Sequence, residues 1–472
     1  MSFANVLADR YASPEMVAIW SPAAKVRIER ELWLAVLAGQ QALGLEVPAG
    51  AVEGYRAVID RVDLDSIRDR ERVTRHDVKA RIEEFNALAG FEAIHVGLTS
   101  RDLTENVEQL QIYRSLRLVQ YRSLAVLARL AERAELHRDL VLAARTHNVA
   151  AQPTTLGKRF ANLGEEALVA HRRLENLLAR YPLRGLKGPV GTQADLLDLF
   201  DGDHAKVAQL EAVVMLHLGL PAQLGAVGQV YPRSLDFDVV TALAQIASAP
   251  ANLALLVRLM AGLELATEGF RDGQVGSSAM PHKMNTRSAE RIGGLLAVLR
   301  GHVTMAASML GDQWNEGDVS CSVTRRVVLV DAFLALDGLL ETTLEVLADF
   351  GPYPAVIEAE LQRFLPFLAS TRLMLAAVRR GMGREEAHHV VGEHAVAVAR
   401  AMRQDGSGND LLARLGADTR FPLNGGELTA LLADHQQFVG RSAQQIEAFV
   451  AAVGALCGAN PHAAGYRGRP TL

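Results

Sequence analysis

The sequence predicts an all-α protein built around a bundle of long helices. Apolar residues recur three or four positions apart over long stretches, as they do along one face of an α-helix. No stretch alternates between apolar and polar residues for long enough to predict a sheet. The chain of 472 residues also exceeds the roughly 250 to 300 residues at which a single core stops growing, so two or three domains are expected.

Breaks in the helical pattern divide the chain. Gly90 and Gly97 interrupt the segment from Asn86 to Ser100, and a Gly-Pro-Tyr-Pro run begins at Gly351. We therefore expect an N-terminal helical domain, a central long-helix bundle and a C-terminal helical domain, which cover residues 1–98, 99–352 and 353–472.

Four long helices are expected in the central domain. The pattern is clearest from Leu110 to Ala134. Similar patterns run from about Phe237 to Phe270, from Ala289 to about Leu310 and from Arg325 to Phe350, each far longer than an average helix of roughly 11 to 12 residues. Bundles with apolar stripes on more than one face are often completed by other subunits, so an oligomer is expected.

Charge and hydropathy argue against two classes of partner. The net charge of -5 gives no global reason to bind nucleic acid or an anionic membrane, so an anionic ligand needs a local cluster of cations. The segment from Val239 to Val257 has no charged residue and could span a bilayer by length. It contains polar residues and Pro250, so a helix inside a protein bundle is expected.

The two cysteines, Cys321 and Cys457, exclude a disulfide framework and favour a reducing, cytoplasmic compartment. The N-terminus lacks the pattern of a signal peptide. Glu386 and His389 have the spacing of a metal-binding pair, but the sequence offers no second such motif, and no metal or cofactor is expected. No histidine neighbours Cys321 in sequence, so we do not expect it to be a nucleophile.

The segment 276–285, GSSAMPHKMN, is the first candidate for chemistry. Glycine, serine, proline and asparagine also mark ordinary connecting loops. The alternative is that Ser277, Lys283, Asn285 and the backbone N–H groups of the loop surround an anionic reaction centre.

This segment, with Glu290 five residues after Asn285, resembles the signature loop GSSxMPxKxN of the fumarase/aspartase superfamily, which includes argininosuccinate lyases and adenylosuccinate lyases. The resemblance implies an all-α, three-domain fold that tetramerises through its bundle. It also implies that Ser277 is the catalytic base and that Lys283 and Asn285 stabilise the negative charge that develops on the substrate.

A second segment begins at Arg145 and reads RTHNVAAQPTTLG. A lone histidine after a Leu/Ala-rich stretch is more often structural than catalytic. The segment nevertheless resembles the second active-site segment of the superfamily. The resemblance makes His147 the candidate acid, with His76 as the competing acid, and adds Thr146 to the substrate contacts.

The choice of substrate rests on the segment Thr74 to Val78, TRHDV. Without further information it is a charged helical face. It resembles the nucleotide site of adenylosuccinate lyases, whereas fumarases and argininosuccinate lyases carry different residues there. The substrate contacts that the resemblance implies, besides those named above, are Arg10, Tyr11, Arg75, His76, Asp77, Thr99, Ser100, Gln229, Arg291, Ser322 and Arg326.

The activity that the resemblance implies is β-elimination of fumarate from adenylosuccinate, giving AMP, and from succinylaminoimidazole carboxamide ribotide, giving AICAR. The active sites would be shared within a homotetramer. Another superfamily lyase such as argininosuccinate lyase, or a non-catalytic helical scaffold, remains the alternative. The intact set of Ser277, Lys283, Asn285 and His147 argues against the scaffold.

Two positions depart from the pattern of the family. Thr286 follows Asn285 where a proline is usual, so the next helix could begin differently. Gly317 stands where relatives often place a phosphate-binding arginine. Arg10 and Arg326 are therefore expected to carry more of the charge that meets a phosphate.

Overall fold

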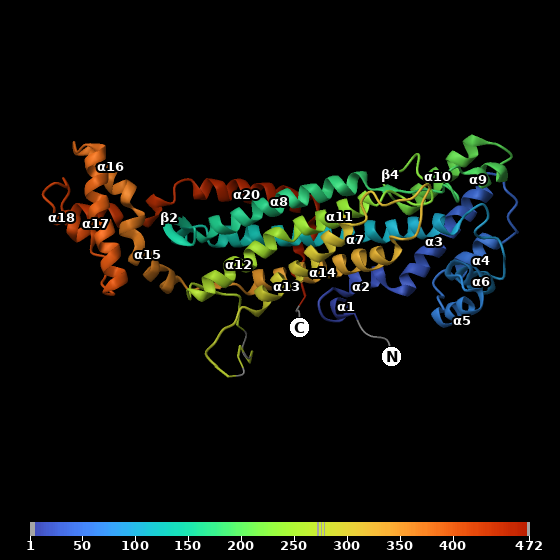
Figure 1. The fold of residues 1–472 in the computed structure, drawn as a ribbon, viewed down its shortest axis with the longest axis horizontal. Helices are drawn as coiled ribbons and strands as arrows, with labels where there is room; N and C mark the ends of the chain where they lie inside the picture. Colours follow the sequence, from blue (N-terminus) through green and yellow to red (C-terminus); the bar gives the residue numbers. More distant parts are fainter. Residues whose placement is uncertain (1–4, 271–272, 275, 278, 470–472) are drawn as a thin grey trace.

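The computed structural model describes residues 5–270, 273–274, 276–277 and 279–469. The molecule is an elongated rod in which long helices lie side by side along the middle and shorter helices gather at each end (Figure 1). The expected all-α class with a central long-helix bundle is confirmed.

Five of the six N-terminal helices begin at a polar residue whose side chain accepts a hydrogen bond from the first turn, and α4 begins at Gly50 without such a cap. Ser13 Oγ accepts from Met16 N at 3.2 Å, and His76 Nδ1 accepts from Lys79 N at 3.3 Å. These helices are α1 (Val6–Arg10), α2 (Pro14–Trp20), α3 (Pro22–Ala42), α4 (Ala51–Ala57), α5 (Leu64–Thr74) and α6 (Asp77–Ala89).

The bundle contains α7 (Ser100–Leu136), α8 (Leu156–Arg180), α11 (Ser234–Ile246), α12 (Ser248–Gly262), α13 (Arg287–Ala307) and α14 (Ser322–Asp349). Three of the four predicted long helices correspond to α7, α13 and α14. The fourth prediction was too long, because the helix is divided at Ala247 and ends at Gly262. Pro250 lies in the first turn of α12 and has no N–H to continue the hydrogen-bond ladder, which favours the division.

The apolar segment of this fourth helix is part of the bundle. Ser234–Gly262 is long and apolar enough to cross a membrane, and 56% of its most apolar window is buried inside the protein. Helices α11 and α12 pack against α8, α13 and α14. The unburied part includes Leu255 and Leu259 of α12, and Leu263, which caps the helix, continues their spacing of four.

A β-hairpin lies where the sequence analysis expected no sheet. Strand β1 (Val141–Thr146) pairs antiparallel with β2 (Val149–Thr155), and His147 and Asn148 form the turn with φ values of 53° and 61°. Positive φ at both positions defines a type I′ turn, which is usually made by Asn-Gly or Asp-Gly. The hairpin was not predicted because its turn residues are unusual and because Pro153 lies inside the second strand.

The remaining short elements connect the bundle or lie at its ends. They are the two-residue pairs β3 (Pro182–Leu183) with β4 (Ala222–Gln223) and β5 (Ala266–Thr267) with β6 (Gly351–Pro352), and the helices α9 (Ala194–Leu199), α10 (His204–Leu218), α15 (Pro354–Leu368), α16 (Ser370–Arg379), α17 (Arg384–Gln404), α18 (Leu411–Ala417), α19 (Gly425–Leu432) and η1 (His435–Phe438).

The last two helices, α20 (Ser442–Ala459) and α21 (Pro461–Gly465), return to the bundle. Helix α20 packs along α7 and α8, and a Cβ atom added at Gly164 would lie only 2.0 Å from the ring of Phe449. Helices α15 to α19 form a separate core with Val141 and Ala143 of the hairpin. The domain edges near 98 and 352 stay predictions, and residues 442–465 pack with the bundle although they follow the second edge.

Candidate active site

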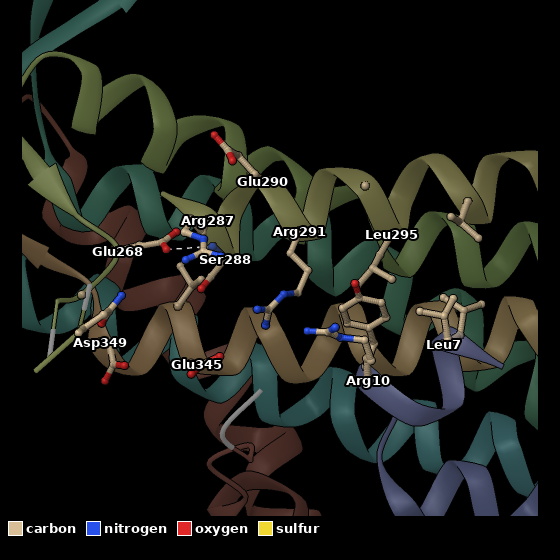
Figure 2. A pocket seen from close by; sticks show the side chains of 17 residues that line it. Leu7, Arg10, Glu268, Arg287, Ser288, Glu290, Arg291, Leu295, Glu345 and Asp349 are labelled. Carbon is tan, nitrogen blue, oxygen red and sulfur yellow. Dashed lines mark hydrogen bonds between the residues drawn. The ribbon is translucent and has the colours of Figure 1, made fainter. Parts of the chain in front are cut away.

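A cavity of about 750 Å³ lies between α1, α13, α14 and the segment that follows β5. Figure 2 shows Arg10 of α1 and Arg291 of α13 extending into it toward one another. The Arg291 guanidinium carbon lies 6.0 Å from the centroid of the Tyr11 ring. Glu345 and Asp349 also line the cavity, and a carboxylate or phosphate that enters it would bind between the two guanidinium groups.

The opposite end of this cavity contains a residue that the sequence analysis missed. The carboxylate of buried Glu268 accepts hydrogen bonds from the backbone N–H groups of Ser288 and Ala289, both at 2.9 Å. Figure 2 shows the bond to Ser288. Thr286, at the N-cap position of α13, makes no side-chain cap hydrogen bond. Glu268 therefore closes the N-terminus of α13 from another segment, where a carboxylate also meets the positive end of the helix dipole.

The described residues of the signature loop project away from the bundle (Figure 1). Ser277 Oγ accepts hydrogen bonds from the backbone N–H groups of Ala279 (3.3 Å) and Met280 (3.1 Å). Asn285 Nδ2 donates to Gly276 O at 2.8 Å, which closes the loop, and Lys283 is exposed. The second serine, Ser278, lies outside the described residues.

His147 is at the exposed tip of the β-hairpin, and Thr146 is the last residue of β1. No hydrogen bond involves the His147 side chain in the described part of the chain, so its imidazole is available to a ligand or another subunit. The hairpin lies beside α15 at the end of the rod opposite α4, α5 and α6 (Figure 1).

The expected nucleotide-site residues form the junction between α5 and α6. Arg75 ends α5 in the left-handed conformation with φ of 52°, and His76 caps α6. Asp77 is in the first turn of α6, where Arg81 Nη2 lies 3.2 Å from its Oδ2. Burial raises the pKa of Asp77, but Arg81 and a backbone N–H outweigh it, so the pKa is lowered and the carboxylate stays ionised.

His95 was not predicted and is close enough to His76 for their charges to interact. Its Nδ1 accepts a hydrogen bond from Trp33 Nε1 at 3.0 Å, and its φ is 69°. Burial lowers the pKa of His95, and the His76 charge lowers it further against the opposing effect of Asp102. The sequence signal for His95 was its place three residues before Leu98-Thr99-Ser100, inside the glycine-interrupted segment.

Thr99 and Ser100 lie at the start of α7, and Gln229 lies in the turn before α11. Asp102 Oδ2 accepts from Thr99 N at 2.9 Å, and its Oδ1 pairs with Arg184 at 2.6 Å. Arg184 in turn donates to the carbonyl of the residue before Gln229 at 3.0 Å. The buried Asp102–Arg184 pair therefore links Thr99 to the backbone beside Gln229, and these two expected substrate contacts lie in one local group.

Ser322 and Arg326 lie in the first turns of α14, where Arg326 is exposed. Gly317 precedes this helix with φ of 143°, and a Cβ atom added there would approach Val230 Cγ2 to 3.0 Å. Both observations restrict the position to glycine. The backbone at position 317 therefore disfavours any side chain, including the arginine that was expected there from the family pattern.

The neighbour of Arg326 belongs to a buried ion network that sequence reasoning missed. Arg325 Nε lies 2.7 Å from Asp236, and Glu105 lies 2.8 Å from Arg233 and 3.7 Å from Arg325. The network joins the start of α14 to α7 and α11. Helical spacing was the available signal, because Arg325 precedes the buried Val328 by three positions and so shares its face.

One chain therefore distributes the expected residues over six places: the arginine-lined cavity, the projecting loop, the hairpin tip, the α5–α6 junction, the group that joins Thr99 and Gln229, and the start of α14. The hairpin and the α5–α6 junction lie at opposite ends of the rod (Figure 1). Among the described residues, no group of three or more metal-ligating side chains is present.

Solved structures of lyase and cycloisomerase enzymes share this fold. Fumarate lyase from Mesorhizobium sp. BNC1 superposes with a TM-score of 0.79 at 21% identity and covers 96% of this chain and 100% of its own. The 3-carboxy-cis,cis-muconate lactonizing enzyme from Pseudomonas putida gives 0.81 at 20% identity, with coverages of 96% and 99%. The family model described as Lyase matches residues 12–301, so the fold and sequence define a lyase-family protein.

Sequence likeness then selects one branch of this class. The model described as Adenylosuccinate lyase C-terminus matches residues 366–449. Adenylosuccinate lyases from Schistosoma mansoni and Saccharomyces cerevisiae are 34% and 35% identical over 95% of this chain and 94% of their own lengths. That from Methanothermobacter thermautotrophicus is 34% identical over 84% of this chain and 87% of its own. The chain belongs to the adenylosuccinate lyase family.

Proposed function

We propose that this protein eliminates fumarate from adenylosuccinate to give AMP, and from succinylaminoimidazole carboxamide ribotide to give AICAR. The observation that carries this proposal is the likeness to adenylosuccinate lyases along nearly the whole chain. The family acts on small-molecule substrates and is usually oligomeric.

The charge distribution supports a substrate with a phosphate and two carboxylates. The chain is acidic overall, yet Arg10 and Arg291 point into one cavity, and Arg75, Lys283 and Arg326 are exposed at other expected contacts. Guanidinium groups bind carboxylate and phosphate by paired hydrogen bonds. With glycine at 317, Arg10 and Arg326 carry the phosphate contacts.

The reaction requires a base for the proton beside a carboxylate and an acid for the departing nitrogen. Ser277, as its alkoxide, takes the proton from carbon, and the remaining electron pair gives a carbanion whose charge spreads onto the carboxylate. Lys283, Asn285 and loop N–H groups stabilise that charge. The C–N bond then breaks with its electrons passing to nitrogen, which His147 protonates; His76 is the second candidate for this acid.

The loop geometry supports the assignment of Ser277 as base. A neutral hydroxyl is a weak base, and its own proton must first pass to solvent water before the loop closes over the substrate. The two backbone N–H groups that donate to Ser277 Oγ, from Ala279 and Met280, stabilise a negatively charged oxygen more than a neutral one. They therefore lower the free energy of forming the alkoxide.

Separation of the site residues supports active sites shared within a homotetramer. Ser277, His147 and His76 belong to different groups in one chain, so other copies must complete each site. The surface offers a matching interface, because α12 exposes Leu255 and Leu259, and Gly293, Gly294 and Gly301 of α13 have no neighbour within 4 Å of an added Cβ. Small residues on a helix face let another helix approach closely. Such an assembly would cover the unburied part of the apolar helix, in keeping with a cytoplasmic enzyme.

The deciding experiment incubates the purified protein with adenylosuccinate and follows fumarate and AMP. Equimolar release of both products is the expected result. Argininosuccinate serves as the control substrate, and turnover of it alone would replace this proposal with the argininosuccinate lyase alternative. A folded, oligomeric protein that releases fumarate from neither substrate would favour the scaffold.

A further inference from the structure

The turn that carries His147 is strained and has few supports. His147 and Asn148 both have positive φ, a conformation that disfavours side chains other than glycine and, less strongly, asparagine. Such a residue costs on the order of 1–3 kcal/mol and persists when its surroundings hold it. Arg145 and Asn148 both line two cavities, of about 490 Å³ and about 460 Å³, so the turn projects between two open spaces.

One side chain spans this turn. Arg145 Nη1 donates to Asn148 O at 3.2 Å, across the base of the turn. Its other terminal nitrogen, Nη2, forms an ion pair with Glu360 of α15, in which the two side chains are 21% and 12% exposed. A bidentate guanidinium can make both contacts at once, whereas an ammonium group cannot match its planar geometry.

Glu360 also offsets the charge of a second half-buried guanidinium group. Arg159 of α8 donates to Ala143 O of β1 at 2.9 Å, so it fixes the hairpin further from the tip. Burial lowers the pKa of Arg159 to about 10, and Glu360 opposes that effect. Without Glu360, two guanidinium groups would face each other at the hairpin with their charges uncompensated.

We infer that Arg145 and Glu360 are positioning residues that hold the His147 turn in its strained conformation and so aim the imidazole at the substrate nitrogen. This inference rests on the proposed function, because it needs His147 to be the acid. Through Glu360 of α15, the core formed by α15 to α19 would then hold the catalytic histidine at the hairpin tip in place.

The role predicts a specific kinetic signature. Misplacement of an acid by about 1 Å can reduce a rate roughly 10²-fold while binding is kept. In Glu360→Gln we expect kcat to fall at least roughly tenfold and KM to stay within about threefold. Glu360→Asp should recover part of the loss, and Glu358→Gln, an exposed change on the same helix, should remain within about twofold of the wild type.

Deuterium exchange separates positioning from a general structural effect. Proton removal by Ser277 precedes use of the acid, so a misplaced His147 lets the carbanion return to substrate. In D₂O, the ratio of deuterium entering unreacted adenylosuccinate to fumarate formed should rise in Glu360→Gln. Loss of folding would instead lower both processes together.

Two outcomes would overturn the inference. One is that the Glu360→Gln and Arg145→Lys variants both fold, assemble and keep kcat within about twofold of the wild type. The other is a lowered kcat with an unchanged exchange ratio. If the Glu360→Gln variant fails to fold, the Arg145→Lys variant provides the test, since lysine keeps the positive charge at that position. A wild type that releases no fumarate would reject the proposed function itself, a result distinct from both.

Discussion

Glu268 and Ala289 are 21 positions apart, yet the Glu268 carboxylate accepts the Ala289 backbone N–H at 2.9 Å. Through this bond and its partner to Ser288, the segment after β5 is fastened to the start of α13. The signature loop leaves from one of these segments and returns to the other. Its two ends are therefore held at a fixed separation while the described part between them projects from the bundle.

Removal of this cap should affect stability and activity together. Loss of a side-chain helix cap typically costs about 1 kcal/mol, so Glu268→Ala should lower the thermal unfolding midpoint by a few degrees. It should also lower kcat, because the base of the loop is no longer fixed. Differential scanning calorimetry and a fumarate assay measure the two effects. An unchanged midpoint with unchanged kcat would show that the cap is not needed.

Ser277→Ala should lose roughly 10²–10⁴ in kcat while the fold and the assembly are kept. The Ser277 hydroxyl accepts hydrogen bonds from the backbone N–H groups of two exposed residues of its own loop, so its removal leaves neither of these donors buried and unsatisfied. Single-turnover measurements report the chemical step directly. Ser308→Ala, at the other end of α13, is the matched control, and near wild-type turnover by Ser277→Ala would reject the base assignment.

Shared sites predict complementation between two inactive variants. When Ser277→Ala and His147→Ala proteins are mixed under conditions that exchange subunits, some sites receive the intact serine from one copy and the intact histidine from another. Fumarate release should then rise well above that of either protein alone. Each variant put through the same exchange by itself is the control. No recovery despite verified mixed oligomers would mean that both residues come from one copy.

Arg326→Gln should raise KM for adenylosuccinate roughly tenfold or more, because a hydrogen bond to a charged group contributes about 1.5–3 kcal/mol. In the proposed site, glycine at 317 leaves Arg326 to balance more of the phosphate charge. The effect should shrink at high salt, which screens exposed charges. A change below about twofold at low salt would remove Arg326 from the phosphate site.

Glu29 should make stability fall with rising pH. Burial raises its pKa from 4.5 to about 7 against the opposing charge of Arg81. The folded state thus binds this proton more tightly than the unfolded chain. The resulting stability is complete below about pH 4.5 and is lost as pH rises through about 7, a change on the order of 3 kcal/mol. Unfolding midpoints from pH 5 to 8 should fall for the wild type relative to Glu29→Gln, while exposed Glu53→Gln follows the wild type.

The sequence predicted what regular periodicity and fixed motifs encode. The long amphipathic patterns located α7, α13 and α14, because a bundle helix must keep one apolar face over its whole length. The signature loop and the Thr146-His147 segment were visible as residue strings. Their distribution over one chain was not visible, since the separation of Ser277 from His147 depends on how the helices are arranged.

Contacts between distant positions could not be predicted from local pattern. Glu268 caps a helix that begins 19 residues later, and Arg145 pairs with Glu360 across 215 positions. Neither acid differs in sequence from a solvated surface residue. The hairpin was missed for a related reason: the tertiary contacts of Arg145, rather than turn propensity, hold His147 in its conformation.

The return of α20 to the bundle has a consequence for biosynthesis. Phe449 occupies the space that Gly164 leaves on α8, so one groove of the bundle is filled by a helix that is translated after α7, α8 and α11 to α14. Earlier helices can form as they leave the ribosome, but an apolar groove stays open to water until the C-terminal helix follows. A premature stop before Ser442 should therefore yield an aggregation-prone chain rather than a shortened enzyme.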